Sequence, residues 1–419
     1  MSEDRIVMHI DVNSAYLSWE AIHRLENGST IDLREIPSVV GGDPKTRRGI
    51  VLAKSIPAKR YKIQTGETIH VAFQKCPILT IVKPSYGLYM KCSNAMKSVL
   101  EEYVPTLQRF SIDEFFIELT DCKKLYGDPV EFAHTLKDAI KTRLGFTVNV
   151  GVSTNKLLAK VASDFEKPDN VHTLYPHEIE KKMWPLPVGD LYMVGRSTVP
   201  KLHEIGIYTI GDLASIDRDF IRFKLKKHGL MIYDFAHGIE DSALRGAQNE
   251  SIKGLGNSTT IRYDVTQKED AYMVLLSLTE MVCMRLREEN LLAGLVSVSI
   301  RSHDLSRYSH QHKLSFQTDV TSVVFEEVKR LFDASWQGEA IRHLGVRLSN
   351  FKPKDFYQYS LLDPVNIEMR RALDQTIDDI RLKYGNKSLI RACFVQSGFA
   401  PVQGGTVNDE DYPMMSSVL

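Results

Sequence analysis

Two adjacent carboxylates, Asp113 and Glu114, lie in the middle of an aromatic and β-branched segment, residues 107–119. This composition predicts two strands that meet at the acid pair. Neighbouring side chains in a regular strand point to opposite faces, whereas at a tight bend the two carboxylates converge. Converging carboxylates either repel one another and raise a pKa, or they act as ligands of a divalent metal ion. A solvated acidic turn is the alternative that the pair alone leaves open.

A third acid, Asp11, ends the apolar run of residues 6–12. The run predicts a buried central strand with Asp11 at its carboxyl end, where ligands of open α/β sheets gather. A turn at Asn13 and Ser14 then leads into a helix from Ala15. Asp11 taken alone is also compatible with the N-cap of that helix.

A helix that bears lysines follows the strand predicted over residues 146–152, and Ser153 or Thr154 is placed to cap it. Its apolar residues form one face, and its lysines follow a different stripe. The stripe consists of Lys156, Lys160 and Lys167. Such lysines either form a wet helix face or neutralise phosphates as point charges. Three acids on two strands, together with this stripe, indicate metal-assisted phosphoryl transfer.

The elements that must position these residues follow one another in a recognisable order. A strand, a helix, an acidic hairpin, a second helix and a strand form the order of a split βαβ, ferredoxin-like sheet. The expected elements are a strand over 6–12, helices over 94–103 and 130–143, the hairpin over 107–119 and a strand over 146–152. Residues 21–76, with ten Lys or Arg against five Asp or Glu, predict a small basic subdomain that suits phosphates, or a solvated surface.

The second half of the chain begins after Pro185 and Pro187 with two short helices and turns that contain Gly195 and Gly206. This stretch resembles a helix-hairpin-helix, whose backbone N–H groups bind nucleic-acid phosphates without reading sequence. Met193 stands where the first turn of that motif usually has glycine, which weakens the phosphate-binding interpretation of this turn.

A linker over residues 241–256 precedes a second α/β unit, predicted from apolar periodicity. Its expected elements are helices over 273–289 and 320–332 and strands over 295–301, 313–316 and 341–348. A last helix after Asp363-Pro364 carries apolar residues on one face, and residues 404–419 have a composition typical of disorder. That apolar face consists of Ile367, Leu373, Ile377, Ile380 and Tyr384.

Length and composition bound the class of protein. At 419 residues about three domains are expected. There is no apolar run long enough to span a membrane. The acidic N-terminus argues against a secretory signal. The five cysteines are scattered, which indicates reduced thiols in the cytoplasm. The net charge of zero argues against tight binding to nucleic acid by bulk electrostatics, so a nucleic-acid enzyme of this kind would need a tether.

In this order and spacing the motifs resemble the Y-family, translesion DNA polymerases, and among them the UmuC-like branch. The resemblance rests on Asp11 with Tyr16, on the Ser-Ile-Asp-Glu hairpin of residues 111–114, and on the lysine helix that ends at Lys167-Pro168. It covers about residues 5–350 and implies an α/β (α+β) right hand with a ferredoxin-like palm. The implied domains are a palm (1–20 and 77–185), small fingers (21–76), a helix-hairpin-helix thumb (186–245), an α/β little finger (246–352) and a tail (353–419).

The resemblance also implies a role for individual residues. Asp11, Asp113 and Glu114, with the carbonyl of Val12, would hold two Mg²⁺ ions. Tyr16 would act as a steric gate against ribonucleotides, and Lys59 and Lys167 would contact the triphosphate. Ile56 replaces a tyrosine that often contacts phosphate in the family. The expected DNA contacts are Lys156, Lys160, Gly195 and Gly206.

The implied function is low-fidelity DNA synthesis across damaged template during DNA repair and the SOS response, with primer–template DNA and dNTPs as substrates. Gln358, Leu361 and Leu362 resemble a peptide that binds the bacterial sliding clamp, and a UmuD-like subunit or RecA is a further possible partner. Two alternatives stay open: a nucleotidyl cyclase, which uses a similar palm, and a non-catalytic scaffold that binds DNA or the clamp.

Overall fold

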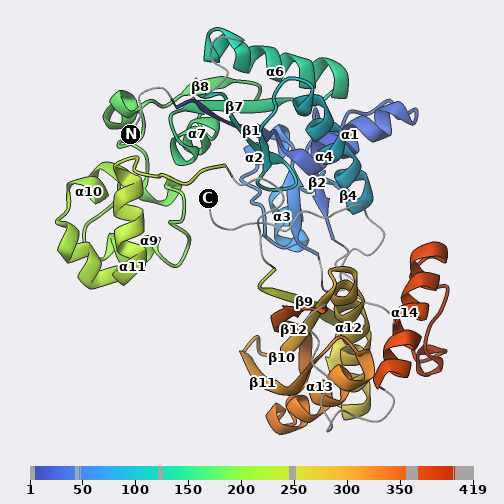
Figure 1. Ribbon diagram of the computed structural model, residues 1–419. Coiled ribbons are helices and arrows are strands. Elements are labelled where there is room, and N and C mark those ends of the chain that lie inside the picture. The colour runs from blue at the N-terminus through green and yellow to red at the C-terminus, as the bar shows by residue number, and fades with distance from the viewer. Residues whose placement is uncertain are drawn as a thin grey trace. The chain divides into compact units, whose positions relative to one another are not determined.

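The computed structural model describes residues 5–42, 47, 49–120, 126–244, 252–354, 367–399 and 401. The chain divides into two compact units (Figure 1). Within the described residues, the first unit contains 5–42 and 51–244, and the second contains 47, 49, 50 and everything from 252 onward. No helix in the described part of the chain is long and apolar enough to cross a membrane. The palm, fingers, thumb and little finger boundaries given above stay predictions.

A five-stranded sheet forms the centre of the first unit, in the order β5-β6-β1-β7-β8. Its strands are β1 (Val7–Val12), β5 (Leu107–Arg109), β6 (Glu114–Glu118), β7 (Val148–Ser153) and β8 (Val171–Thr173). Strand β1 is buried along its whole length between two antiparallel neighbours, β6 and β7. The predicted central strand that ends near Asp11 is therefore confirmed.

The alternation of β1 divides its side chains between two cores. Met8, Ile10 and Val12 pack on one side of the sheet, in a core shared with α1 (Ala15–Glu26), α4 (Tyr86–Glu101) and α6 (Pro129–Leu144). Val7 packs on the other side with α7 (Lys156–Ser163). Asp11 is an even number of residues from Val7, so its side chain belongs to the α7 side. The fold thus brings the acid and the lysine helix to the same face of the sheet.

The helix boundaries follow the predictions with two differences. Helix α6 matches the predicted helix over 130–143 to within one residue, whereas α4 begins eight residues before the predicted Asn94. The predicted capping of α7 by Ser153 or Thr154 is wrong. Asn155 is the N-cap, and its side chain accepts a hydrogen bond of 2.9 Å from the Leu158 amide.

The first unit contains two smaller parts besides the central sheet. A three-stranded sheet, ordered β3-β2-β4, has a small core of its own with two short helices. These elements are β2 (Ser38–Gly41), β3 (Val51–Lys54), β4 (Thr80–Val82), α2 (Ile56–Arg60) and α3 (Ile69–Lys75). The helical part contains α8 (Ile179–Lys182), α9 (Val199–His203), α10 (Ile210–Ser215) and α11 (Arg218–Ala236).

Met193 adopts a left-handed backbone with a φ of 69°, the conformation for which the helix-hairpin-helix motif usually employs glycine. The backbone of this turn is therefore kept although the glycine is absent. The next turn, at Gly206, is also left-handed, with a φ of 81°. Thr209 and Asp212 then form a capping box that starts α10.

The second unit is built on a four-stranded antiparallel sheet, ordered β11-β10-β12-β9, with two helices packed against it. The strands are β9 (Gly254–Val265), β10 (Leu291–Ser302), β11 (Arg307–Thr318) and β12 (Ile341–Pro353), and the helices are α12 (Lys268–Glu288) and α13 (Thr321–Ser335). The three predicted strands and both predicted helices are present, and each of these strands is longer than predicted. Strand β9 was not predicted, and it begins inside the predicted linker over residues 241–256.

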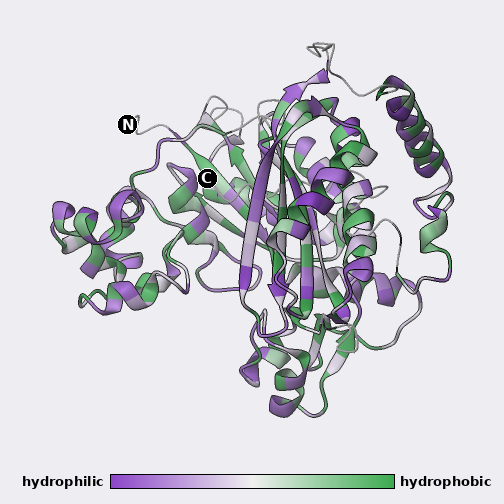
Figure 2. Cartoon of the chain, turned by 90° about the horizontal axis from the view of Figure 1, so that it is seen from below, coloured by the Kyte–Doolittle hydropathy of each residue, from purple (hydrophilic) through white to green (hydrophobic). Residues whose placement is uncertain are grey.

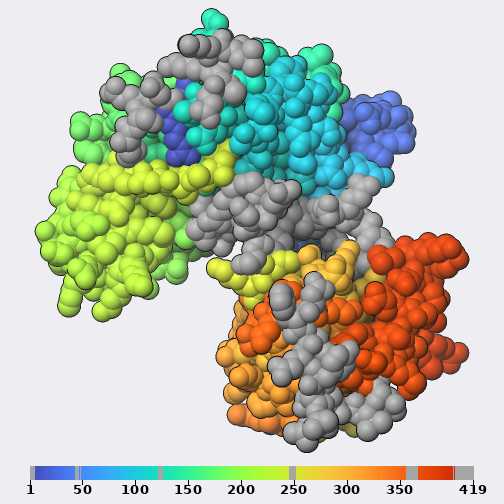
Figure 3. Space-filling view, viewed as in Figure 1, coloured from blue at the N-terminus to red at the C-terminus, as the bar shows by residue number. Residues whose placement is uncertain are grey.

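Helix α14 (Ile367–Tyr384) packs against the rest of the second unit (Figures 1 and 3). Charged residues make several of the contacts. The Arg287 guanidinium donates to both carboxylate oxygens of buried Asp378, at 2.6 and 3.0 Å, and Arg381 contacts Glu280 at 3.5 Å. Figure 2 shows hydrophilic and hydrophobic residues alternating along this helix. Of the apolar face expected from the sequence only Ile367 is buried, while Leu373 and Tyr384 are 60% and 66% exposed.

Gly151 on β7 fixes how closely α7 approaches the sheet. A Cβ at this position would lie 1.9 Å from the Ala159 carbonyl oxygen and 2.5 Å from the Ser163 amide nitrogen, both backbone atoms of α7. The helix can approach β7 this closely only because the side chain is absent. Since α7 carries Lys160, this contact also sets the position of the lysine at the site.

We therefore predict that Gly151→Ala lowers the thermal unfolding midpoint, with a loss of stability of about 3 kcal/mol because backbone must move. Gly195→Ala is the matched control, since a Cβ there meets nothing within 4 Å and should change stability by less than about 0.5 kcal/mol. Calorimetry of both variants beside the wild type checks this. Equal midpoints for the two variants would show that α7 does not depend on the missing side chain.

Candidate active site

The three predicted acids meet at one edge of the central sheet. Asp11 and Glu114 are register partners on the adjacent strands β1 and β6. Asp113 precedes Glu114 in the bend of the hairpin, and its carbonyl accepts a 3.1 Å hydrogen bond from the Val12 amide. The Phe110 amide donates to the Glu114 carbonyl at 2.9 Å and closes the bend. The predicted convergence of the carboxylates thus follows from strand pairing and from a tight turn.

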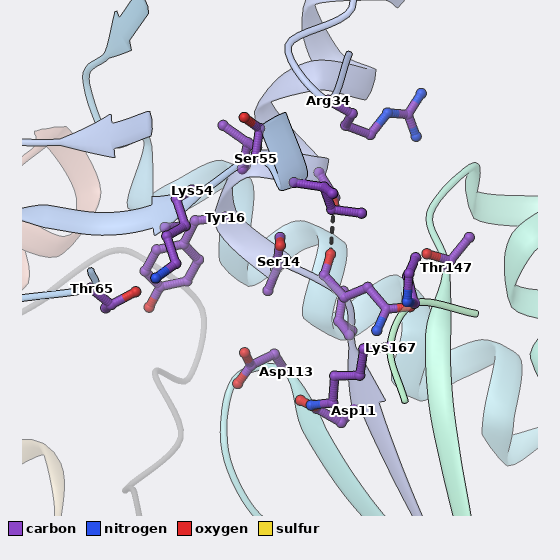
Figure 4. A pocket seen from close by; sticks show the side chains of 18 of the residues that line it. Asp11, Ser14, Tyr16, Arg34, Lys54, Ser55, Thr65, Asp113, Thr147 and Lys167 are labelled. Carbon is purple, nitrogen blue, oxygen red and sulfur yellow. Dashed lines mark hydrogen bonds and ion pairs between the residues drawn. The ribbon is translucent and has the colours of Figure 1, made fainter. Parts of the chain in front are cut away.

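A cleft of about 790 Å³ opens above these acids. Figure 4 shows Asp11 and Asp113 directed into the same space, with Tyr16, Lys54 and Thr65 grouped on another wall. All of the lining residues belong to the first unit.

Two lysines balance the charge of the acids. The Lys167 ammonium donates to Asp11 and also, at 2.8 Å, to Asp164. The Lys160 ammonium donates to Glu114 at 2.6 Å. In the part of the chain that the structure describes, no three Asp, Glu, His or Cys side chains are arranged ready to hold a metal ion. Asp11 and Glu114 thus each contact an ammonium group, whereas Asp113 accepts a hydrogen bond from the Ser111 hydroxyl.

Burial is the main influence on the acids. It raises the pKa of Asp11 to about 6, an effect that Lys167 opposes and that the Glu114 charge increases. Burial likewise raises the pKa of Asp113, where the Ser111 hydroxyl opposes it and Asp11 adds to it. It also raises the pKa of Glu114 against the pull of Lys160. Three carboxylates that are buried or partly buried and that repel one another fit a divalent cation, which would remove the repulsion and accept hard ligands.

His9 is a site residue that the sequence reasoning missed. Its Nδ1 lies 2.7 Å from the Ser163 hydroxyl, and its Nε2 lies 3.9 Å from a Glu114 carboxylate oxygen. Burial lowers the pKa of His9 well below its ordinary value, so the ring is neutral. The signal was present in the sequence, because His9 and Asp11 are two residues apart on one strand and so share a face.

The other walls of the cleft bring in predicted and unpredicted residues. Tyr16 comes from the first turn of α1, and Lys59 comes from α2, whose N-cap Ser55 accepts a 3.1 Å hydrogen bond from the Ala58 amide. Ile56 lines the cleft as well. Sequence reasoning did not single out a further group of lining residues. These are Arg34, Lys54, Ser55, Thr65 and Thr147.

The residues predicted to contact DNA are in unlike surroundings. Lys156 is fully buried, and its ammonium donates to the Ala243 carbonyl at 3.1 Å. This placement contradicts the predicted lysine stripe, because Lys156 points into the protein while Lys160 reaches the acids. Gly195 and Gly206 lie in the turns on either side of α9. The predicted clamp residues Gln358, Leu361 and Leu362 lie outside the described residues.

Sequence families match the two units separately. The impB/mucB/samB family matches residues 10–164, its helix-hairpin-helix motif matches residues 176–207, and its C-terminal domain matches residues 252–361. A DNA polymerase IV from Clostridium acetobutylicum is 44% identical over 94% of this chain and 98% of its own length. The chain belongs to the impB/mucB/samB family.

Other members support the same assignment. A DNA polymerase IV from Acetivibrio thermocellus is 36% identical over 94% of this chain and 98% of its own, and a DNA polymerase IV 2 from Bacillus subtilis is 33% identical over 94% and 95%. A solved chimera of Y-family DNA polymerases has the same fold, with a TM-score of 0.70 and 21% identity over 83% of this chain and 99% of its own.

This member of the impB/mucB/samB family is thus a Y-family DNA polymerase, as the motifs predicted. Such enzymes depend on divalent metal ions. The named relatives are of the polymerase IV type, and the narrower assignment to the UmuC-like branch stays a prediction. Family membership favours a polymerase over the cyclase and over the non-catalytic scaffold.

The raised pKa of Asp113 has a consequence for stability. A carboxyl whose pKa is raised in the folded protein stabilises the fold while protonated and loses that contribution as the pH rises through its folded-state pKa. At pH 7, without divalent ions, ionised Asp113 therefore destabilises the fold.

Asp113→Asn should accordingly melt a few degrees higher than the wild type at pH 7 without divalent ions, because the amide is neutral and can still bond Ser111. The difference should disappear below about pH 3, where the carboxyl is protonated in both the folded and the unfolded state. Thermal melts across this pH range make the comparison. A variant that melts no higher than the wild type at pH 7 would contradict the electrostatic description of the site.

Proposed function

We propose that this polymerase extends a primer 3′ end across damaged template positions, using two Mg²⁺ ions held by Asp11, Asp113, Glu114 and the Val12 carbonyl. The observation that carries the proposal is the convergence of three carboxylates, Asp11 buried and Asp113 and Glu114 partly buried, at a cleft that also holds Tyr16. Bound there, two Mg²⁺ ions would supply Lewis-acid activation of the primer hydroxyl and stabilisation of the leaving pyrophosphate.

The protein's own cations have a second task in this proposal. Lys167 lies between Asp11 and Asp164, at the edge of the cleft. Burial lowers the pKa of Lys167, but the two acids outweigh this effect, so that its pKa is raised. It therefore stays charged and can turn from Asp11 to a triphosphate oxygen. Lys59 lines another wall of the same cleft and offers a second ammonium. Ile56, one turn earlier, contributes no phosphate hydrogen bond from its side chain.

Tyr16 provides the choice of sugar. Tyr16 lines the cleft from the start of α1, the helix that follows Asp11 and strand β1. A ring placed against C2′ of the incoming nucleotide would clash with a ribose hydroxyl. Small fingers and a small thumb would leave the site open, so that the shape of the base pair is checked weakly. Low fidelity and tolerance of damaged templates follow, in keeping with a role in the cytoplasm during the SOS response.

Primer extension with Mg²⁺ and dNTPs, on plain and abasic templates, tests this function. The wild type should add a few nucleotides per binding event and pass the abasic position. Asp113→Ala and Glu114→Ala should reduce extension to background, because each removes a metal ligand. Asp138→Ala, which removes an exposed carboxylate on α6, should keep wild-type activity. Activity in either ligand variant, or a wild type that stops at every abasic position, would refute the proposal.

The sliding clamp is the proposed tether, through Gln358, Leu361 and Leu362. A net charge of zero gives weak binding to DNA, and attachment to a clamp would raise the effective concentration of the polymerase at the primer. A UmuD-like subunit or RecA would act in addition to this attachment.

Replacing both Leu361 and Leu362 by Ala should remove the stimulation of extension by the clamp, while extension without the clamp stays at the wild-type rate. Titration of clamp into both proteins under single-turnover conditions measures this. Undiminished stimulation of the double variant would remove these residues from the proposal and leave the polymerase activity untouched.

A further inference from the structure

The ring of Tyr16, the proposed steric gate, packs against the ring of a second tyrosine, Tyr89. The ring of Tyr89 on α4 stacks on the Tyr16 ring, with centroids 4.3 Å apart and planes 11° apart. Tyr89 is fully buried, whereas Tyr16 is partly buried and lines the cleft. One face of the Tyr16 ring is therefore covered by Tyr89, a side chain that is fully enclosed by the protein.

A hydrogen bond fixes the supporting ring. The Tyr89 hydroxyl donates to Glu20 Oε1 at 2.8 Å, and Glu20 is 3% exposed. Burial raises the pKa of Tyr89, so the hydroxyl keeps its proton and remains a donor. Glu20 lies four residues after Tyr16 on α1, hence on the same side of that helix. Helix α1 thus contacts Tyr89 at two points, through the stacked ring of Tyr16 and through the Glu20 carboxylate. Figure 1 shows α1 and α4 side by side.

Two more aromatic rings complete the support. Tyr86, one turn before Tyr89 on α4, meets both Tyr16 and Tyr89 edge-on, at 6.3 and 5.8 Å. Trp19, with an exposed fraction of 1%, lies tilted against the same two rings, at 6.0 and 5.9 Å. Edge-on and offset contacts of this kind are the favourable arrangements for aromatic pairs. Tyr16 is consequently held in place from the side opposite to the cleft.

A steric gate rejects a ribose hydroxyl only to the extent that its ring cannot move. If the ring yields, the clash with the hydroxyl is relieved at the cost of displacing the ring, and that cost limits the discrimination. A side chain whose position is locked by packing and by a buried hydrogen bond resists displacement. We propose that Tyr89, anchored by Glu20, is a positioning residue that sets the sugar discrimination of this polymerase. The inference rests on the proposed role of Tyr16.

The test is the ratio of kcat/KM for a dNTP to kcat/KM for the NTP with the same base, measured by single-nucleotide primer extension. Tyr89→Leu removes the stacked ring and should lower this ratio about tenfold, equivalent to about 1.4 kcal/mol. The change should come from faster use of the NTP, with kcat/KM for the dNTP nearly unchanged. Tyr89→Phe keeps the ring, loses only the hydroxyl, and should lower the ratio about threefold.

Phe132→Leu is the matched control. Phe132 packs in the same hydrophobic core as Tyr89 and pairs with Tyr126 at 4.5 Å. Its loss should lower thermal stability and leave the ratio at the wild-type value, as expected of damage that is merely structural. Tyr89→Phe keeps the experiment decisive if Tyr89→Leu does not fold.

Tyr16→Ala, measured in parallel, separates the two proposals. A low ratio in both Tyr16→Ala and the Tyr89 variants supports the inference. A low ratio in Tyr16→Ala, with wild-type ratios in both Tyr89 variants, overturns the role of Tyr89 and leaves the steric gate intact. A wild-type ratio in Tyr16→Ala overturns the steric gate itself, and with it the inference.

Discussion

The crowding of three carboxylates at one buried edge of a sheet is the constraint on which the rest of this structure depends. Asp11 and Glu114 are brought together by strand pairing, and Asp113 by the bend that precedes β6. Burial and mutual repulsion raise the pKa of each, so the fold pays a cost for holding them ionised. Lys160 and Lys167 reduce that cost, and a pair of divalent ions would reduce it further. An arrangement that is unfavourable alone is therefore suited to binding metal and phosphate.

Several distant features of the chain serve that edge. Gly151 lets α7 approach β7, and so places Lys160 beside Glu114. His9, kept neutral by burial, lies between Ser163 of the same helix and Glu114. On the far side of the sheet, the Tyr16–Tyr89 stack joins α1 to α4 and supports the part of the cleft wall that Tyr16 lines. Packing on both sides of the sheet thus positions the residues that line the cleft.

The elements that a local pattern specifies were predictable. The apolar run before Asp11, the acidic hairpin and helix α6 were placed within one or two residues, because strand alternation, turn chemistry and helix periodicity are read over short windows. The acids, Tyr16 and Lys59 were identified only as an ordered set, and the fold brings them to one cleft. His9 could have been found from its spacing to Asp11, but it was not considered.

What the sequence could not supply depends on partners far along the chain. Lys156 looked like part of a wet stripe, yet its acceptor is the carbonyl of Ala243, 87 residues away. Helix α14 looked like an ordinary amphipathic helix, yet it buries Asp378 because Arg287 on α12 needs a counter-charge. Ser153 was unavailable as a cap because its hydroxyl is already bonded to the Leu174 carbonyl. The spacing of residues within one element does not predict such pairings with residues far along the chain.

The most direct test of the three-carboxylate site is anomalous diffraction from crystals of the polymerase bound to primer–template DNA, a non-hydrolysable dNTP and Mn²⁺ as a substitute for Mg²⁺. The site described here predicts two Mn²⁺ peaks within ligand distance of Asp11, Asp113 and Glu114, with Lys167 turned away from Asp11. Acids that keep Lys160 and Lys167 as partners, with manganese absent from that edge of the sheet, would contradict it.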